Sequence, residues 1–308
     1  MRPYLCTMLD IQTATAIPHV TRREDYTPPD WQVPEIALDF SLDAAATLVR
    51  ATLHVVRDSA HDRPLVLDGG GQTPLSVKVD GVAVSDWRIE NDALVVPLSG
   101  TDHMVETEVE IAPDRNTQLM GLYASGGNLC TQCEAEGFRR ITFFPDRPDV
   151  LSIYKVRMTA DRKRYPVLLA NGDPVAQGDA SDGRHWAEWH DPYPKPCYLF
   201  ALVAGDLVAN TTTFTTRSGR EVSLGIWVRA ADLPKTAHAL AAIDADTGAP
   251  AVMLIGDPEY YGRFFGFTAT ATAAWRVPGP VERHRLLARG ADVPDAAGLL
   301  GPRVPACT

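Results

Sequence analysis

The sequence predicts a mainly β protein. Apolar residues recur at every second position through most of residues 35–228, and turn-forming Asp and Asn residues separate these runs. Of the 308 residues, 45% are hydrophobic and 22% are charged. This composition is typical of a globular chain that can bury a core, and it argues against disordered, collagen-like and coiled-coil proteins.

The first strands are predicted within residues 35–111. Two turn pairs, Asp80-Gly81 and Asn91-Asp92, lie between short alternating runs and predict type I′ hairpins. A later run places Glu106, Glu108 and Glu110 on one face of a strand, which we interpret as a solvated face. The region is therefore expected to be antiparallel β structure.

Strands continue toward the carboxyl end until a predicted helix. That helix covers residues 233–246, with Asp232 as the possible N-cap, Pro234 in its first turn and Gly248 as its stop. After it, residues 249–308 are rich in Ala, Gly and Pro, and a buried strand is predicted at 251–255. The further strands before the helix are predicted at 152–158, 167–170, 186–189, 198–203, 211–216 and 222–228, with Ser218-Gly219 turning the last pair.

Charge and cysteine usage restrict the partners and the compartment. The 29 Lys and Arg against 39 Asp and Glu give a net charge of -10, which argues against a nucleic-acid or anionic-membrane binder. No apolar run is long enough for a membrane span, and the first residues lack the apolar core of a secretory signal. Five cysteines form a sparse, odd set, so we expect reduced thiols and a cytoplasmic location.

Three segments carry a family resemblance: Arg22 to Phe40, Met120 to Val150 and Lys195 to Leu207. They resemble the amino-terminal domain of the bacterial aminopeptidase N family, which are gluzincin zinc aminopeptidases. The resemblance implies a saddle-like antiparallel β domain over 22–207. It also implies that 208–240 are the opening strands of a truncated thermolysin-like catalytic domain, and it leaves 1–21 as an unassigned leader.

The resemblance also implies a substrate site. Gln132 and Glu134 match the residues that hold the α-amine of a peptide, and carboxylate and amide oxygens are suitable acceptors for the three N–H donors of an ammonium group. The alternative interpretation is that this loop is only a polar connection.

The zinc chemistry of the family has no counterpart in the sequence. No two histidines stand at i and i+4, so the H-E-x-x-H motif is absent, as is the G-A-M-E-N segment. We therefore predict no metal ligand and no catalytic residue of the peptidase type. His185 and His190 are expected to be structural, and Cys130-Thr131-Gln132-Cys133 is not expected to serve metal or redox chemistry.

The tail, residues 241–308, resembles the late part of a GNAT N-acetyltransferase. In that fold a strand leads to a short helix whose tyrosine serves as a general acid, and Tyr260 or Tyr261 is the matching candidate. No glycine-rich phosphate turn precedes residue 233, so coenzyme A is not an expected cofactor. The aromatic run is more simply interpreted as hydrophobic packing.

The first predicted function is that of a relative of the zinc metalloaminopeptidases, whose family acts on peptide amino termini. We expect this chain to be a truncated or fused form that is catalytically incomplete. The alternative is a non-catalytic β module that binds peptides or partners, with self-association through an exposed domain face. A third hypothesis is a remnant acyl-CoA-dependent N-acetyltransferase. Neither nucleic acid nor membrane is an expected partner.

Overall fold

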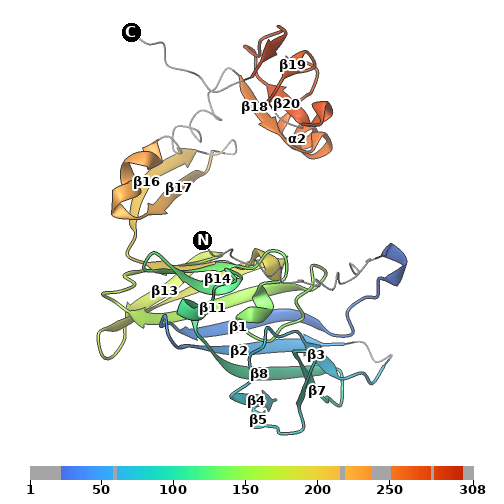
Figure 1. The fold of residues 1–308 in the computed structure, drawn as a ribbon, viewed down its shortest axis with the longest axis vertical. Coiled ribbons are helices and arrows are strands. Elements are labelled where there is room, and N and C mark those ends of the chain that lie inside the picture. Colours follow the sequence, from blue (N-terminus) through green and yellow to red (C-terminus); the bar gives the residue numbers. More distant parts are fainter. Residues whose placement is uncertain (1–21, 58–60, 216–218, 238–250, 279–280, 301–308) are drawn as a thin grey trace, which may run out of the picture. The chain divides into compact units, whose positions relative to one another are not determined.

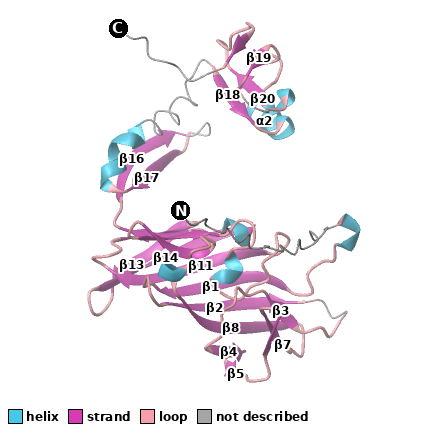
Figure 2. Ribbon diagram, viewed as in Figure 1, coloured by secondary structure: helices cyan, strands magenta, loops and turns pink. Residues whose placement is uncertain are grey.

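The computed structural model describes residues 22–57, 61–215, 219–237, 251–278 and 281–300. The chain divides into two compact units, Met1–Asp206 and Leu207–Thr308. Strands dominate both (Figure 2), so the mainly β prediction is confirmed. Among the described residues, no helix is long and apolar enough to cross a membrane.

We call the first unit the β domain. A large sheet forms the body of this domain (Figure 1). Its strand order is β13-β14-β11-β1-β2-β8-β4-β5. All neighbouring strands run antiparallel except β1 and β11, which pair in parallel, so the expected all-antiparallel sheet has one exception. The strands are β1 (Gln32–Ser41), β2 (Thr47–Val56), β4 (Ser76–Val79), β5 (Val82–Ala83), β8 (Asp102–Ile111), β11 (Leu151–Asp161), β13 (Asp173–Asp179) and β14 (Arg184–Pro196).

Two smaller sheets complete the β domain. One has the order β12-β15-β10-β9, and the other has the order β3-β7-β6. Their strands are β12 (Val167–Ala170), β15 (Leu202–Gly205), β10 (Asn128–Gln132), β9 (Gly121–Ser125), β3 (Leu65–Leu67), β7 (Ala93–Val96) and β6 (Arg88–Glu90).

The core lies on one face of the large sheet. Alternate residues of β1, such as Ile36 and Phe40, are fully buried, as the two-residue periodicity predicts. An aromatic group continues this core: the Phe138 ring lies 5.1 Å from that of Phe144 and 5.2 Å from that of Phe200, both edge to face. Phe138 begins the 3₁₀ turn η3 (Phe138–Arg140), so the core reaches the loop between β10 and β11.

Both predicted hairpin turns are confirmed. Asp80 and Gly81 have φ of 52° and 79°, and they join β4 to β5. Asn91 and Asp92 have φ of 49° and 65°, and they join β6 to β7. Positive φ at both central residues is what a type I′ turn requires, and Gly, Asn and Asp tolerate it best.

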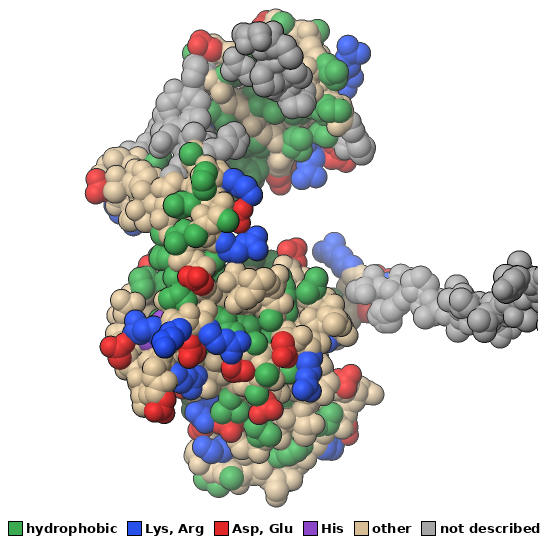
Figure 3. Space-filling model, turned by 60° about the vertical axis from the view of Figure 1, so that its left-hand side comes forward, with side chains coloured by type: hydrophobic (Ala, Val, Ile, Leu, Met, Phe, Trp, Pro, Cys, Tyr) green, Lys and Arg blue, Asp and Glu red, His purple; other side chains and the backbone are tan. Residues whose placement is uncertain are grey.

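The other face of the large sheet carries charges in alternating order. The cross-strand register places Glu188, Arg157, Asp39, Arg50 and Glu108 in one row across five strands. Arg157 pairs with Glu188, and Arg50 pairs with Glu108. The interpretation of the glutamate row as a solvated face is therefore confirmed, and Figure 3 shows acidic and basic side chains intermingled on the surface of this domain.

Two predicted elements were wrong in part. The strand predicted at 198–203 begins instead with the 3₁₀ turn η4 (Cys197–Leu199), because Cys197 turns inward to a buried carboxylate, and β15 follows. The predicted N-cap Asp232 lies inside the 3₁₀ turn η5 (Ala230–Lys235), where its carboxylate bonds Lys235 at 2.6 Å instead of a backbone amide. Residues 238–246 of the predicted helix lie outside the described residues.

The second unit contains short elements. Its first hairpin confirms the strand predictions at 211–216, except for Thr216 outside the described residues, and at 222–228. The predicted strand at 251–255 is present, but its predicted burial is wrong: Met253 is 40% and Ile255 is 56% exposed, because the strand belongs to a two-stranded sheet. The elements are β16 (Val208–Thr215), β17 (Glu221–Val228), β18 (Val252–Ile255), α2 (Pro258–Phe265), β19 (Trp275–Arg276), β20 (Leu286–Arg289) and β21 (Gly298–Leu299).

The burial of β3 makes a matched stability test possible. Leu67→Ala should lower the free energy of unfolding of the β domain by about 2 to 5 kcal/mol, because Leu67 is fully buried and its loss leaves a cavity. Val66→Ala, one residue away on the same strand, should change it by about 0.5 kcal/mol, because Val66 is 47% exposed. Urea unfolding followed by tryptophan fluorescence measures both, and equal losses would contradict the assigned faces of β3.

Candidate functional site

The two predicted substrate-binding residues lie where β10 ends. Gln132 is the last residue of β10 and Glu134 follows after one residue; both side chains are exposed, while Cys133 between them is buried. The Gln132 Nε2 atom donates to the Glu134 carbonyl at 3.2 Å, and the Glu134-Ala135 peptide bond is cis. The structure thus brings Gln132 and Glu134 together on an exposed surface.

A tight turn holds the loop that follows β10. The Gly137 N–H donates to the Cys133 carbonyl at 2.8 Å and closes the loop around Glu134. A Cβ at Gly137 would lie 2.5 Å from the backbone carbonyl oxygen of Gln132 and 3.1 Å from the backbone nitrogen of Gly121. Only glycine fits this close approach, so Gly137 fixes the path of the backbone that carries Glu134.

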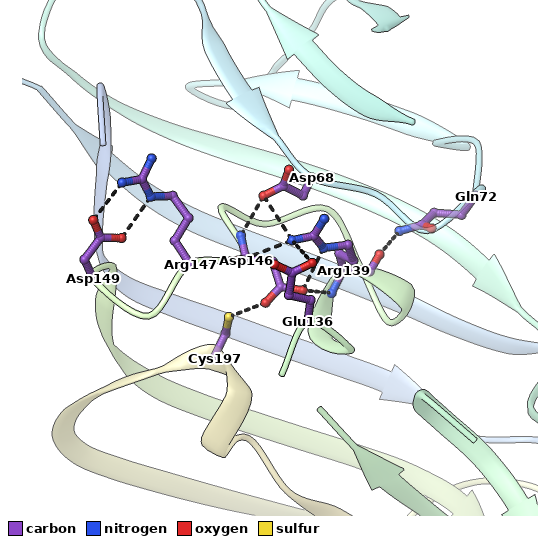
Figure 4. Close-up of polar contacts among 8 residues, drawn as sticks. All are labelled: Asp68, Gln72, Glu136, Arg139, Asp146, Arg147, Asp149 and Cys197. Carbon is purple, nitrogen blue, oxygen red and sulfur yellow. Dashed lines mark hydrogen bonds and ion pairs between the residues drawn. The ribbon is translucent and has the colours of Figure 1, made fainter. Parts of the chain in front are cut away.

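A buried carboxylate anchors the far end of this loop (Figure 4). Asp146 has a side chain only 1% exposed, and its Oδ2 accepts from both the Arg139 backbone N–H and the Arg139 Nε at 3.0 Å. Its Oδ1 accepts from the Cys197 thiol at 3.0 Å. Both carboxylate oxygens therefore have donors, as a buried charge requires.

The Arg139 guanidinium lies among three carboxylates. Besides Asp146, it reaches Glu136 at 3.3 Å and Asp68 at 3.9 Å. Burial lowers the pKa of Arg139, but these carboxylates outweigh burial and hold that pKa above its ordinary value. Arg139 therefore remains a cation, and its contact with Glu136 connects the anchor to the tip of the loop.

Hydrogen bonds between side chains and backbone groups connect Arg139 and Asp146 to the segment after β3. The Gln72 Nε2 donates to the Arg139 carbonyl at 2.6 Å, and the Asp146 N–H donates to the Asp68 carboxylate at 2.9 Å. The segment before β1 is attached close by, since Tyr26 and Arg147 both bond Asp149. The bond from Arg147 lowers the pKa of Asp149, and the bond from Tyr26 lowers it further. Burial raises this pKa, but the two bonds outweigh burial and hold the pKa below its usual value.

The thiols near the loop are held protonated. Burial, followed by the nearby Asp146 charge, raises the pKa of Cys133 to about 12. The same two causes, with the hydrogen bond to Asp146, raise the pKa of Cys197. A thiol in this state is a poor nucleophile and a poor metal ligand. Cys130, Cys133 and Cys197 are all free, and Cys130 lies half-buried on β10.

The remaining candidates lie apart from the loop. His185 is buried, with its Nε2 2.7 Å from the Tyr165 carbonyl, which is the structural role predicted for it. Tyr260 and Tyr261 lie on α2 in the second unit, and their ring centroids are 5.1 Å apart. The Tyr261 ring contacts Phe267, which fits the predicted hydrophobic packing. Tyr260 is 51% exposed and does not fit it.

The described residues do not fit a zinc site. None of them form a group of three or more His, Cys, Asp or Glu side chains that could hold a metal ion. The loop itself offers acceptors: the Glu134 carboxylate and the Gln132 amide oxygen suit a cationic amine, which needs acceptors of this kind.

Comparison with known proteins identifies the family of the β domain. Residues 76–199, which include β10 and the whole loop, match the Peptidase M1 N-terminal domain family. The chain is 47% identical over 229 residues to aminopeptidase N of Escherichia coli (strain K12), across 74% of this chain. The β domain is homologous to the amino-terminal region of M1 aminopeptidase N. The chain spans about a quarter of that relative, since the alignment covers 26% of its length.

Other relatives of this M1 domain support the assignment. Aminopeptidase N of Caulobacter vibrioides is 47% identical over 228 residues, covering 73% of this chain and 26% of the relative. Aminopeptidase A of Legionella pneumophila, solved with aspartic acid, superposes with a TM-score of 0.69 at 31% identity over 79% of this chain and 28% of that one. An M1 zinc metallopeptidase of Deinococcus radiodurans shares the fold, with a TM-score of 0.55 at 19% identity over 65% of this chain and 48% of that one.

The sequence interpretation missed the anchor of this M1 domain. Arg139 and Asp146 were not singled out, although both stand in the short run 138–146, which also contains Phe138, Phe143 and Phe144. Charged residues in such a run are a signal for a buried pair, because burial of an unpaired charge is costly. The partners Asp68 and Cys197 are far away in sequence and carry no local signal.

Loss of the buried carboxylate should destabilise the domain. Asp146→Asn should lower the free energy of unfolding by about 3 to 5 kcal/mol, because it leaves the partly buried Arg139 without its closest counter-charge. Asp179→Asn is the matched control, since Asp179 is 82% exposed, and it should cost about 0.5 kcal/mol or less. Urea unfolding measures both, and equal small losses would show that Asp146 does not anchor the loop.

Proposed function

We propose that the β domain contributes the amine-binding end of an aminopeptidase substrate cleft. Its support is the exposed pair of Gln132 and Glu134, which a buried anchor holds in place at the end of β10. A peptide α-ammonium would donate to the Glu134 carboxylate and to the Gln132 amide oxygen. Homology to aminopeptidase N adds to this support, because its members are aminopeptidases by name.

Amine binding is the direct test of this proposal. Alanine amide should shift the backbone NMR signals of Gln132 and Glu134, whereas N-acetylalanine amide should not, because acetylation removes the cation. Glu134→Gln should weaken binding about tenfold, the loss expected when one charge-assisted hydrogen bond is removed.

Glu110→Gln is the matched control for that titration. Glu110 is an exposed glutamate on β8, and it lies outside the loop that carries Gln132 and Glu134. Its substitution should leave the affinity for alanine amide unchanged. Equal effects of the two amides, or equal effects of the two substitutions, would refute the assigned site.

We further propose that this chain does not hydrolyse peptides by itself. The family chemistry uses a zinc ion to activate water, and the sequence contains neither H-E-x-x-H nor G-A-M-E-N. The amine-binding loop can orient a substrate, but no residue of this chain is assigned to activate the attacking water.

A chromogenic assay tests that proposal. The purified chain, with zinc added, should release no more nitroaniline from alanyl or leucyl p-nitroanilide than zinc in buffer does. Turnover that a chelator abolishes would overturn the proposal and would point to ligands outside the H-E-x-x-H pattern. Self-association, acyl-CoA-dependent chemistry in the tail and a cytoplasmic location stay predictions from the sequence.

A further inference from the structure

A second polar site lies in the β domain, in a pocket of about 290 Å3. Four parts of the chain line it: the glycine-rich segment 70–72, residues 111–112 and 115–118 at and after the end of β8, Leu122 of β9, and Arg140 at the end of η3. Its lining includes two arginines, Arg115 and Arg140, and no carboxylate. The pocket therefore carries two positive charges in a chain whose net charge is -10.

These two arginines differ from the others of the β domain. Within the described residues, neither the Arg115 nor the Arg140 guanidinium has a hydrogen-bond acceptor or an ion-pair partner. Every other arginine from Arg50 to Arg184 has one. The acceptors are carboxylates for Arg50, Arg57, Arg63, Arg88, Arg139, Arg147, Arg157, Arg162 and Arg164, and the Ser41 hydroxyl and Thr159 carbonyl for Arg184.

The backbone packs closely around Arg140. A Cβ at Gly70 would lie 2.6 Å from the Arg140 Cγ, and a Cβ at Gly121 would lie 2.8 Å from the Arg140 Cβ. Glycine at these two positions lets Arg140 lie against the backbone on both sides. The first part of its side chain, to Cγ, is thus confined before any ligand arrives, which reduces the entropy that binding must remove.

The polar walls of the pocket are already satisfied. Gln72 accepts from the Gly70 N–H and donates to the Arg139 carbonyl, both at 2.6 Å. Asn116 donates to the carbonyls of Met120 and Leu122 at 2.7 and 2.9 Å. These bonds hold the segments on either side of the pocket, and they leave the two guanidinium groups as its unused charged donors.

We propose that this pocket binds a small oxyanion between Arg115 and Arg140. A guanidinium group presents paired N–H donors that match two oxygens of a phosphate or a carboxylate. A phosphate group and a carboxylate share this chemistry, and the pocket is large enough for either. The proposal is independent of amine binding by Gln132 and Glu134.

Calorimetric titration of the full chain tests the proposal. Sodium phosphate and sodium acetate are titrated separately, with sodium chloride holding the ionic strength constant. Saturable binding of phosphate alone assigns the site to phosphate groups, and comparable binding of acetate extends it to carboxylates. If neither anion binds, the proposal is overturned. It is also overturned if an equal concentration of chloride produces the same heat.

Substitutions locate the site. Arg115→Gln and Arg140→Gln should each weaken binding about tenfold or more, since each removes a charged donor. Arg162→Gln is the control, because Arg162 pairs with Asp179 elsewhere and its loss should leave binding unchanged. Arg115 is exposed and has no partner to lose, so Arg115→Gln tests the pocket even where Arg140→Gln disturbs the fold. Unchanged affinity in Arg115→Gln, with an unchanged melting temperature, overturns the proposal.

Discussion

The buried carboxylate of Asp146 is the constraint on which the loop that carries Gln132 and Glu134 depends. A carboxylate removed from water is stable only where donors surround it, and here Arg139 and Cys197 provide them. The donors come from η3 and η4, which are far apart in sequence. Formation of this one site therefore fixes the ends of two loops at once. The path from Arg139 back to Glu134 is short and closed by Gly137, so the exposed acceptors are placed by a buried charge.

The sheet provides the frame for that anchor. The loop of Asp146 leads directly into β11, and the parallel pairing of β11 with β1 places it beside the first strand of the domain. Tyr154 of β11 lies within the aromatic group around Phe138, so hydrophobic packing and the ion pair hold the same turn from two sides. Packing alone does not set the direction of a backbone N–H, whereas the bond to Asp146 does. The two contributions are therefore complementary.

The strands and hairpins of the β domain were predictable because their signals are local. The alternation of apolar and polar residues along β1 and the Asp80-Gly81 turn pair can each be recognised from residues adjacent in sequence. The anchor was not predictable in this way, since Asp68 and Asp146 are brought together only by the fold. Resemblance to the aminopeptidase N family indicated Gln132 and Glu134 but not the groups behind them. The error at 198–203 has the same origin, because the inward turn of Cys197 depends on a carboxylate 51 residues away.

Arg139 and Arg140 show how one short turn separates two roles. Successive side chains of a 3₁₀ turn point about 120° apart, because the turn has three residues. Arg139 therefore points to Asp146, while Arg140 lines the pocket beside Gly70. The first guanidinium is neutralised by carboxylates of this chain, and the second has none among the described residues. A cation that carboxylates of this chain do not neutralise can pair with an external anion. An anion bound there would meet no competing internal carboxylate, since none lines that pocket.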